Sequence, residues 1–250
     1  MQPHAATPHA KPGETFLLSE CYASIQGESS FVGTPTIFVR LYTCNLRCAW
    51  CDSMHAVEGG EYREVTVADL AAEIRRLAEG RGPRRGIRHV CWTGGEPLLQ
   101  ARSIAAAIGL LPADLVHTFE TDGEVDLAPF DALVAGKRGA GLARYIMDVK
   151  CPGSGMTAKL AFQNLAHLRA SDEVKFVILD RADYEFARDV VATHEIPAAT
   201  LLFSPVTPAH KVGKGLDPAT LAAWILEDGL DVRLQIQVHK VIWPGKERGV

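Results

Sequence analysis

Apolar runs of the kind that form β-strands alternate with helix-like segments from Phe16 to the end of the chain. Alternating strands and helices are typical of a mostly parallel sheet covered by helices. The pattern fits either an open doubly wound sheet or a barrel, and periodicity does not choose between them. We expect strands over residues 16–25, 36–42, 88–93, 116–121, 144–149, 174–179, 200–203 and 232–242.

Start and stop signals mark two of the expected helices. Thr66 can cap the first helix, with Asp69 at the third position and Gly80 as the stop. The second helix opens at Asp217-Pro218 and stops at Gly229. The apolar face of the first helix consists of Val67, Leu70, Ile74 and Leu77.

Composition is that of an ordinary soluble enzyme. We see no repeat and no linker in the core, and therefore predict a single domain over residues 14–250 after a disordered tail at 1–13. The tail has Pro and His where a signal peptide needs an apolar core, and no apolar stretch approaches a spanning helix. A net charge of −4 argues against a nucleic-acid surface. We therefore expect a cytoplasmic protein with no membrane partner and no direct nucleic-acid partner.

Three thiols, those of Cys44, Cys48 and Cys51, lie within eight residues. This C-x3-C-x2-C spacing suits three irons of one four-iron cluster and leaves the fourth iron open to a substrate or cofactor. A zinc site of the three thiols with His55 is the alternative, although zinc folds usually carry a second Cys pair downstream. The remaining cysteines are isolated in or beside apolar runs, as buried small hydrophobes are: Cys21, Cys91 and Cys151.

A second motif, residues 93–97, follows the apolar run at 89–92 and has the sequence Thr-Gly-Gly-Glu-Pro. Paired glycines at a strand end let a ligand approach the backbone closely, and Glu96 supplies an acceptor for an ammonium group. A Gly-Gly pair alone is most often an ordinary turn. Its position some forty residues after the three-Cys loop favours a functional interpretation.

Together these motifs resemble the radical S-adenosylmethionine superfamily, and within it the 7-carboxy-7-deazaguanine synthase family. The closer resemblance covers residues 16–250. It rests on Ser24-Ile25-Gln26-Gly27-Glu28, Gly33-Thr34-Pro35, Phe38-Val39-Arg40-Leu41, the Cys loop with Asp52-Ser53, and Gln235-Ile236-Gln237-Val238-His239-Lys240. The resemblance implies an α/β fold, a partial (β/α) barrel whose active site gathers at the carboxyl ends of the strands.

The resemblance also implies ligands for particular residues. The [4Fe-4S] cluster is expected on Cys44, Cys48 and Cys51. S-adenosyl-L-methionine is expected against Trp50, Cys51, Asp52, Gly94, Gly95, Glu96, Asp148, Val149 and Lys150. The substrate, 6-carboxy-5,6,7,8-tetrahydropterin, is expected against Ile25, Gln26, Gly27, Arg40 and Thr93, with Arg40 on its carboxylate. Mg²⁺ is expected on Ser53, where family members commonly have Thr.

The reaction that the resemblance implies is hydrogen abstraction at C6 of the pterin, ring contraction and loss of ammonia to give 7-carboxy-7-deazaguanine, a precursor of queuosine and other 7-deazapurines. A reductant such as flavodoxin or ferredoxin and a homodimer are expected with it. His239 and Glu120 are candidates for a general acid or base. The alternatives are another radical enzyme, such as a glycyl-radical activase, and a non-catalytic zinc module.

Overall fold

A computed structural model describes residues 9–80, 86–197, 200–208, 213–246 and 248–250. They form a nine-stranded sheet with the order β3-β1-β2-β4-β5-β6-β7-β8-β9. From β2 onward neighbouring strands are parallel, whereas β1 is antiparallel to both β2 and β3. The strands are β1 (Thr15–Ile25), β2 (Pro35–Leu41), β3 (Arg63–Thr66), β4 (His89–Gly94), β5 (Val116–Thr121), β6 (Ala143–Asp148), β7 (Glu173–Ile178), β8 (Thr200–Pro205) and β9 (Arg233–Leu234).

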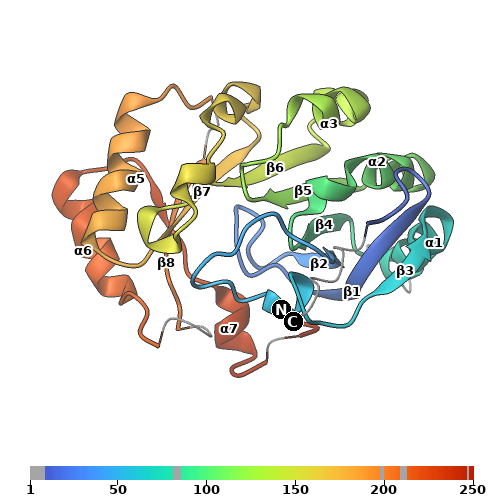
Figure 1. Cartoon of the computed structure of the whole chain (residues 1–250), viewed down its shortest axis with the longest axis horizontal. Helices are drawn as coiled ribbons and strands as arrows, with labels where there is room; N and C mark the ends of the chain where they lie inside the picture. The colour runs from blue at the N-terminus through green and yellow to red at the C-terminus, as the bar shows by residue number, and fades with distance from the viewer. Residues whose placement is uncertain (1–8, 81–85, 198–199, 209–212, 247) are drawn as a thin grey trace, which may run out of the picture.

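The sheet curves into an open arc with helices along its outer side, and the chain between β2 and β3 lies inside the arc (Figure 1). The architecture is therefore a partial barrel, as expected. The α-helices are α1 (Val67–Ala78), α2 (Ala101–Leu110), α3 (Ala128–Leu133), α4 (Ala135–Gly139), α5 (Arg181–Thr193), α6 (Pro218–Asp228) and α7 (Val238–Ile242). Short 3₁₀ turns are η1 (Met54–Ala56), η2 (Pro97–Gln100), η3 (Pro152–Ser154), η4 (Thr157–Lys159) and η5 (Phe162–His167).

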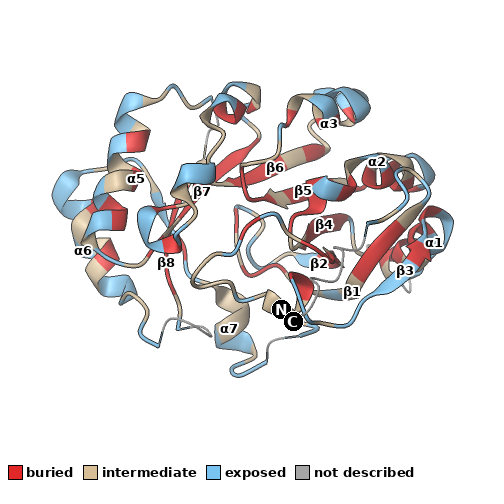
Figure 2. Cartoon of the chain, viewed as in Figure 1, coloured by how far each residue is buried: buried red, intermediate tan, exposed pale blue. Residues whose placement is uncertain are grey.

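Most of the core lies between the sheet and the helices. Figure 2 shows buried residues along the strands and on the inner faces of the helices, with exposed residues on the outer faces. Phe16 stacks on Trp92 at 6.0 Å between ring centroids, and Phe119 meets Phe130 edge to face at 4.9 Å. Aromatic contacts of this kind add to the hydrophobic stabilisation that holds the helices on the sheet.

The expected helix starts and the stop at Gly229 are confirmed, whereas α1 ends at Ala78 with Glu79 rather than Gly80 as its C-cap. The hydroxyl of Thr66 accepts a hydrogen bond from the Asp69 amide at 3.1 Å, which satisfies a free N–H at the start of α1. The carboxylate of Asp217 accepts from the Ala219 amide at the start of α6. Gly229 ends α6 with φ of +61°, a conformation that glycine adopts at little cost. Within the described residues, no helix has both the length and the hydropathy needed to cross a membrane.

The last expected strand, over 232–242, is wrong beyond Leu234. Only β9 pairs with the sheet, and residues 238–242 form α7. The chain leaves the sheet because the Gln235 side chain exchanges two hydrogen bonds with the backbone of Ser29, at 2.8 and 3.0 Å. The Val238 amide then bonds to the Gly27 carbonyl at 3.0 Å. These bonds join the segment after β1 to the segment after β9, where strand pairing does not close the barrel.

The sequence analysis missed β3, which pairs with the first half of β1. Of its four residues only Val65 is buried, so no apolar run marks it as a strand. The other seven expected strands are confirmed to within two residues at each end. Most of the expected tail, residues 1–8, lies outside the described residues. At the end of that tail, the Ser103 hydroxyl accepts a hydrogen bond from the Gly13 amide and donates one to the Lys11 carbonyl.

Candidate active site

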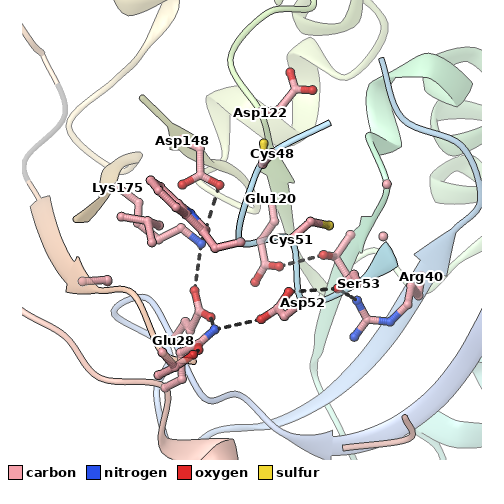
Figure 3. A pocket seen from close by; sticks show the side chains of 18 of the residues that line it. Glu28, Arg40, Cys48, Cys51, Asp52, Ser53, Glu120, Asp122, Asp148 and Lys175 are labelled. Atoms are coloured by element: carbon pink, nitrogen blue, oxygen red, sulfur yellow. Dashed lines mark hydrogen bonds and ion pairs between the residues drawn. The ribbon is translucent and has the colours of Figure 1, made fainter. Parts of the chain in front are cut away.

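A polar cavity opens at the carboxyl ends of the parallel strands, inside the arc (Figure 3). Fourteen of the residues expected to bind ligands line it, although they come from four strands and the loops that follow them: Ile25, Gln26, Arg40, Cys44, Cys48, Trp50, Cys51, Asp52, Ser53, Thr93, Gly94, Gly95, Asp148 and Lys150. Three of the expected residues do not line it, namely Gly27, Glu96 and Val149. The strand-end rule therefore located most of the expected site.

The three-Cys loop runs from the end of β2 into this cavity. Its backbone is held by the Thr43 amide on the Ala56 carbonyl at 2.8 Å and the Ala49 amide on the Ser154 carbonyl at 3.0 Å. Thr43 has φ of +86°, an uncommon conformation for a β-branched residue that turns the chain toward the cavity. All three thiols are free and partly buried. Burial raises the pKa of the Cys44 thiol to about 12 and raises that of Cys48 and Cys51 as well.

The residues present fit a four-iron cluster better than the zinc alternative. Each of the three thiols faces one cavity, and a cluster binds each thiolate to a different iron, so the thiols need not converge on one point. Among the described residues no group of three His, Cys, Asp or Glu side chains can hold a single metal ion. His55, the fourth ligand of the zinc alternative, lies 3.4 Å from the carboxylate of Glu20, outside the cavity lining.

Gly94 and Gly95 press against the start of the Cys loop. A Cβ on Gly94 would lie 2.2 Å from the Leu41 carbonyl oxygen, and one on Gly95 would lie 1.9 Å from that of Thr43. Gly94 also has φ of +125°, which side chains rarely permit. The glycines therefore have a packing role that the sequence analysis did not foresee, and they still present backbone to the cavity.

Glu96 lies beneath the cavity wall with no exposed surface. Its carboxylate accepts hydrogen bonds from the Leu98 amide at 2.8 Å, the Thr121 hydroxyl at 3.1 Å and the Asp122 amide at 2.7 Å. Burial and the nearby carboxylate of Asp122 raise the pKa of Glu96 well above its usual value. In the described structure, it is Asp122 rather than Glu96 that presents a carboxylate to the cavity.

Asp148 ends β6, and Lys150 follows two residues later and forms an ion pair with Asp148 at 3.0 Å. Oδ2 of Asp148 makes this contact. Oδ1 is buried without a hydrogen-bond partner among the described residues, an arrangement that costs free energy unless a ligand donates to it. Val149 is buried behind them in the core.

The segment after β1 and the neighbouring strand ends form a hydrogen-bonded group around Glu120. Its two carboxylate oxygens accept from Gln26 Nε2 at 3.3 Å and Thr93 Oγ1 at 2.7 Å. Gly27 lies behind this group, and a Cβ there would come within 2.1 Å of Nδ1 of His239. Both candidates for a general acid or base, Glu120 and His239, line the cavity.

Arg40 has every guanidinium nitrogen engaged. Nε donates to Glu20 at 3.1 Å, Nη1 to the Ser53 hydroxyl at 3.0 Å and Nη2 to the Tyr22 hydroxyl at 3.0 Å. The Arg40 side chain is only 13% exposed and lines the cavity, although it lies in a strand of mostly apolar residues. These contacts fix the planar fork in one orientation before any ligand binds.

Asp52 lies beside Ser53 in the cavity wall drawn in Figure 3. Its Oδ1 accepts from Ser53, and its Oδ2 accepts from Gln237 at 3.2 Å and lies 3.3 Å from Lys240. Burial alone would raise the pKa of Asp52, but Lys240, Gln237 and Arg40 outweigh burial and hold that pKa below its usual range. The cavity therefore contains an ionised carboxylate beside two cations.

Several lining residues were missed by the sequence analysis, among them Lys175, Ser204, Gln237 and Lys240. Lys175 carried a usable signal, because a lysine inside an otherwise apolar strand is rarely buried without a partner. Gln237 and Lys240 were quoted only as part of a motif and were assigned to a strand. The strand prediction placed these two residues in the sheet, whereas they lie on the segment that leaves the sheet after β9.

Comparison with known proteins gives a consistent result. A family model described as the radical SAM superfamily matches residues 39–152. The chain is 43% identical over 244 residues to the 7-carboxy-7-deazaguanine synthase of Koribacter versatilis, with 93% of this chain and 99% of that protein covered. It is 34% identical to the synthase of the same name from Chlorobaculum tepidum, with 93% and 96% covered.

Two solved structures are similar in fold. QueE from Escherichia coli matches with a TM-score of 0.65 at 24% identity, over 89% of this chain and 94% of that one. Streptococcus suis SuiB bound to S-adenosylmethionine matches with a TM-score of 0.55 at 13% identity, over 81% of this chain and 50% of that one. This chain therefore shares its fold with most of the QueE chain and with about half of the SuiB chain.

Proposed function

Because the chain belongs to the 7-carboxy-7-deazaguanine synthase family of the radical S-adenosylmethionine superfamily, we propose that it converts 6-carboxy-5,6,7,8-tetrahydropterin to 7-carboxy-7-deazaguanine and ammonia. The observation that carries the proposal is a single cavity that joins three free thiols, the Gly94-Gly95 backbone and a preoriented Arg40. Substrate and products balance without net oxidation, so the cofactor can serve as a catalyst.

In this proposal Cys44, Cys48 and Cys51 hold a [4Fe-4S] cluster. When bound, the cluster and S-adenosyl-L-methionine supply the radical that abstracts hydrogen from the substrate. Gly94 and Gly95 present backbone to the methionine end of the cofactor, and Trp50 lies along it. The unpartnered Oδ1 of Asp148 is an acceptor suited to a ribose hydroxyl.

Arg40 binds the substrate carboxylate in this proposal. Its contacts with Glu20 and Tyr22 keep the guanidinium oriented, while the edge that now donates to Ser53 faces the cavity. Gln26, Thr93 and Glu120 together offer donors and acceptors to the purine-like edge of the pterin. Water leaves the cavity as the pterin fills it, which strengthens each of these polar contacts.

We assign the Mg²⁺ ion to Ser53. Its hydroxyl faces the cavity beside the ionised carboxylate of Asp52, and oxygen ligands of this kind suit Mg²⁺, which keeps several waters. The neighbouring cations Arg40 and Lys240 weaken such a site until the substrate carboxylate adds its negative charge. Metal and substrate are therefore expected to bind together, with the ion orienting the carboxylate.

The wider setting follows from the same proposal. A one-electron reductant such as flavodoxin or ferredoxin donates the electron that reduces the cluster. The protein acts as a homodimer in the cytoplasm. The product enters queuosine or another 7-deazapurine through later enzymes, without direct contact between this chain and nucleic acid.

Anaerobic reconstitution tests the function. Purified protein is loaded with iron and sulfide, reduced, and supplied with S-adenosyl-L-methionine, Mg²⁺ and the carboxytetrahydropterin, and products are identified by mass spectrometry. We expect brown protein that forms the deazaguanine acid, and no product from Cys48→Ala. Colourless protein containing zinc would overturn the cluster assignment. Formation of 5′-deoxyadenosine without the acid would overturn the substrate assignment and favour another radical enzyme.

A further inference from the structure

Lys175 lies in the middle of β7 and is 8% exposed. Its Nζ lies 2.8 Å from Oε2 of Glu28 and 3.7 Å from Oδ2 of Asp148 (Figure 3). Asp148 is its register partner on the adjacent strand β6, whereas Glu28 follows β1, four strands further along the sheet. The Lys175–Glu28 contact therefore crosses the interior of the barrel.

Each partner of Lys175 belongs to a different part of the proposed site. Glu28 directly follows the pterin segment, residues 25–27, so a shift of Glu28 moves Gln26. Asp148 belongs to the segment proposed to bind the cofactor, and it also contacts Lys150 at 3.0 Å. The other oxygen of Glu28 accepts from Gln237 Nε2 at 2.7 Å, and the same nitrogen donates to Asp52.

The electrostatics make Lys175 the cation on which this group depends. Burial alone would lower the pKa of Lys175, but Asp148 and Glu28 outweigh burial and keep the ammonium charged. Without that ammonium, Glu28 would lose its only ion-pair partner among the described residues and remain a largely buried carboxylate, 15% exposed, near Asp148 and Asp52. An unpaired buried carboxylate must take up a proton or move toward water, and either change displaces the segment that carries it.

We propose that Lys175 is a positioning residue that fixes the pterin segment, through Glu28, relative to the cofactor segment, through Asp148. Its role is to keep the C6 hydrogen of the pterin within reach of the radical centre. The inference rests on the proposed function and goes beyond it, because Lys175 need touch neither ligand. Misplacement of reacting groups by about 1 Å can cost about a hundredfold in rate, so a single ion pair can control the coupling of radical formation to product formation.

A double-mutant cycle tests the proposal with Lys175→Met, Glu28→Gln and the two combined. One readout is the ratio of 5′-deoxyadenosine to deazaguanine acid during turnover, and another is the dissociation constant of the pterin measured on loaded protein without reductant. We expect each single variant to raise both quantities by about tenfold or more, and the double variant to stay within about twofold of Lys175→Met, because both changes remove one contact. Lys137→Met, an exposed lysine near the loop before β5, is the control and should match the wild type.

The outcomes separate this inference from the function. If Lys175→Met keeps the wild-type ratio and pterin affinity, or if the effects of the two substitutions multiply, the positioning role is overturned while the function stands. If Lys175→Met loses its cluster or its cooperative thermal unfolding, the product ratio and pterin affinity of Glu28→Gln alone test the positioning role. That variant removes the carboxylate charge and leaves the lysine in place. A wild type that neither binds the pterin nor makes the acid would overturn both proposals.

Discussion

The Nη1 atom of Arg40 donates a hydrogen bond to the hydroxyl of Ser53 across 3.0 Å. The proposed partner of the substrate carboxylate and the proposed metal ligand therefore touch each other inside the cavity. Ser53 in turn donates to Oδ1 of Asp52 at 3.1 Å. A carboxylate entering here would meet a guanidinium and a metal ion at the same point, so the two sites should be tested separately.

Replacing Arg40 should weaken substrate binding more than it slows the bound complex. Arg40→Met removes a buried, charge-assisted contact, and we expect KM for the carboxytetrahydropterin to rise about a hundredfold. Arg40→Lys keeps the charge but loses the planar fork, so its KM should lie between those of the wild type and Arg40→Met. Steady-state kinetics under anaerobic conditions measures KM and kcat for each protein. An unchanged KM in Arg40→Met would remove this residue from substrate recognition.

Ser53 should govern the response to Mg²⁺. Ser53→Ala deletes the proposed ligand oxygen, so its turnover should no longer change when Mg²⁺ is added. Ser53→Thr keeps the oxygen and restricts the rotamer, and should reach full turnover at a lower Mg²⁺ concentration than the wild type. Rates measured with and without Mg²⁺ in all three proteins decide the question. Equal rates throughout would remove the metal from the site.

Much of the fold could be predicted because core strands carry short apolar runs, such as residues 37–39 in β2 and 201–203 in β8. The failures occurred where local pattern and tertiary contact disagree. Residues 234–242 alternate like a strand, yet pairing with β8 ends at the Gln235 amide, the Gln235 side chain bonds to Ser29, and Val241 is 69% exposed in α7. No single-sequence pattern reports a partner two hundred residues away.

Gly95 should be intolerant of even a methyl group. In Gly95→Ala the Cβ would meet the Thr43 carbonyl at 1.9 Å and the Cys44 side chain at 3.0 Å, so the start of the cluster loop would have to move. We expect loss of most bound iron and a thermal midpoint lower than that of the wild type.

Gly109→Ala provides the matched control for this substitution. Gly109 is exposed near the end of α2 with no atom within 4 Å of its added Cβ. Alanine there should leave the iron content unchanged and stabilise the protein by about 0.5–1 kcal/mol. Similar iron loss in both variants would show that the effect of Gly95→Ala is not local to the cluster loop.

Two buried histidines should make the stability depend on pH below neutrality. Burial lowers the pKa of His89 to about 4, with a contribution from Arg144, and lowers that of His117 to about 3. In the unfolded chain the two histidines take up protons near pH 6.5, whereas in the folded chain they stay neutral at that pH. The free energy of unfolding is therefore highest above pH 6.5 and decreases as the pH falls toward 4. Each histidine should contribute a loss of about 2 kcal/mol at pH 5.

Urea unfolding at pH 7.5 and pH 5 measures this effect. Carboxyl groups titrate over the same range, so the test compares the wild type with His89→Gln. The variant should lose about 2 kcal/mol less than the wild type between the two pH values. Identical losses would show that His89 is protonated in the folded state, or that it does not titrate over this range in either state.

The site was predictable to the extent that its residues occur in short motifs at strand ends, such as Cys48 and Thr93. The electrostatic support was not. Lys175, Glu28 and Gln237 meet from β7, the segment after β1 and the segment after β9, and their contact depends on the curvature of the whole sheet. Glu96 shows the converse, because it stands in a motif expected to bind the cofactor, yet its carboxylate accepts three internal hydrogen bonds.

The central claim is that the radical formed in this cavity takes the hydrogen from C6 of the pterin. Turnover with substrate deuterated at C6, followed by mass spectrometry of the recovered S-adenosyl-L-methionine and 5′-deoxyadenosine, tests it most directly. The account predicts deuterium on the 5′ carbon of the recovered cofactor and none on carbon in the deazaguanine acid, because the former C6 carries no hydrogen in that product. Product formed while the cofactor stays unlabelled would contradict it.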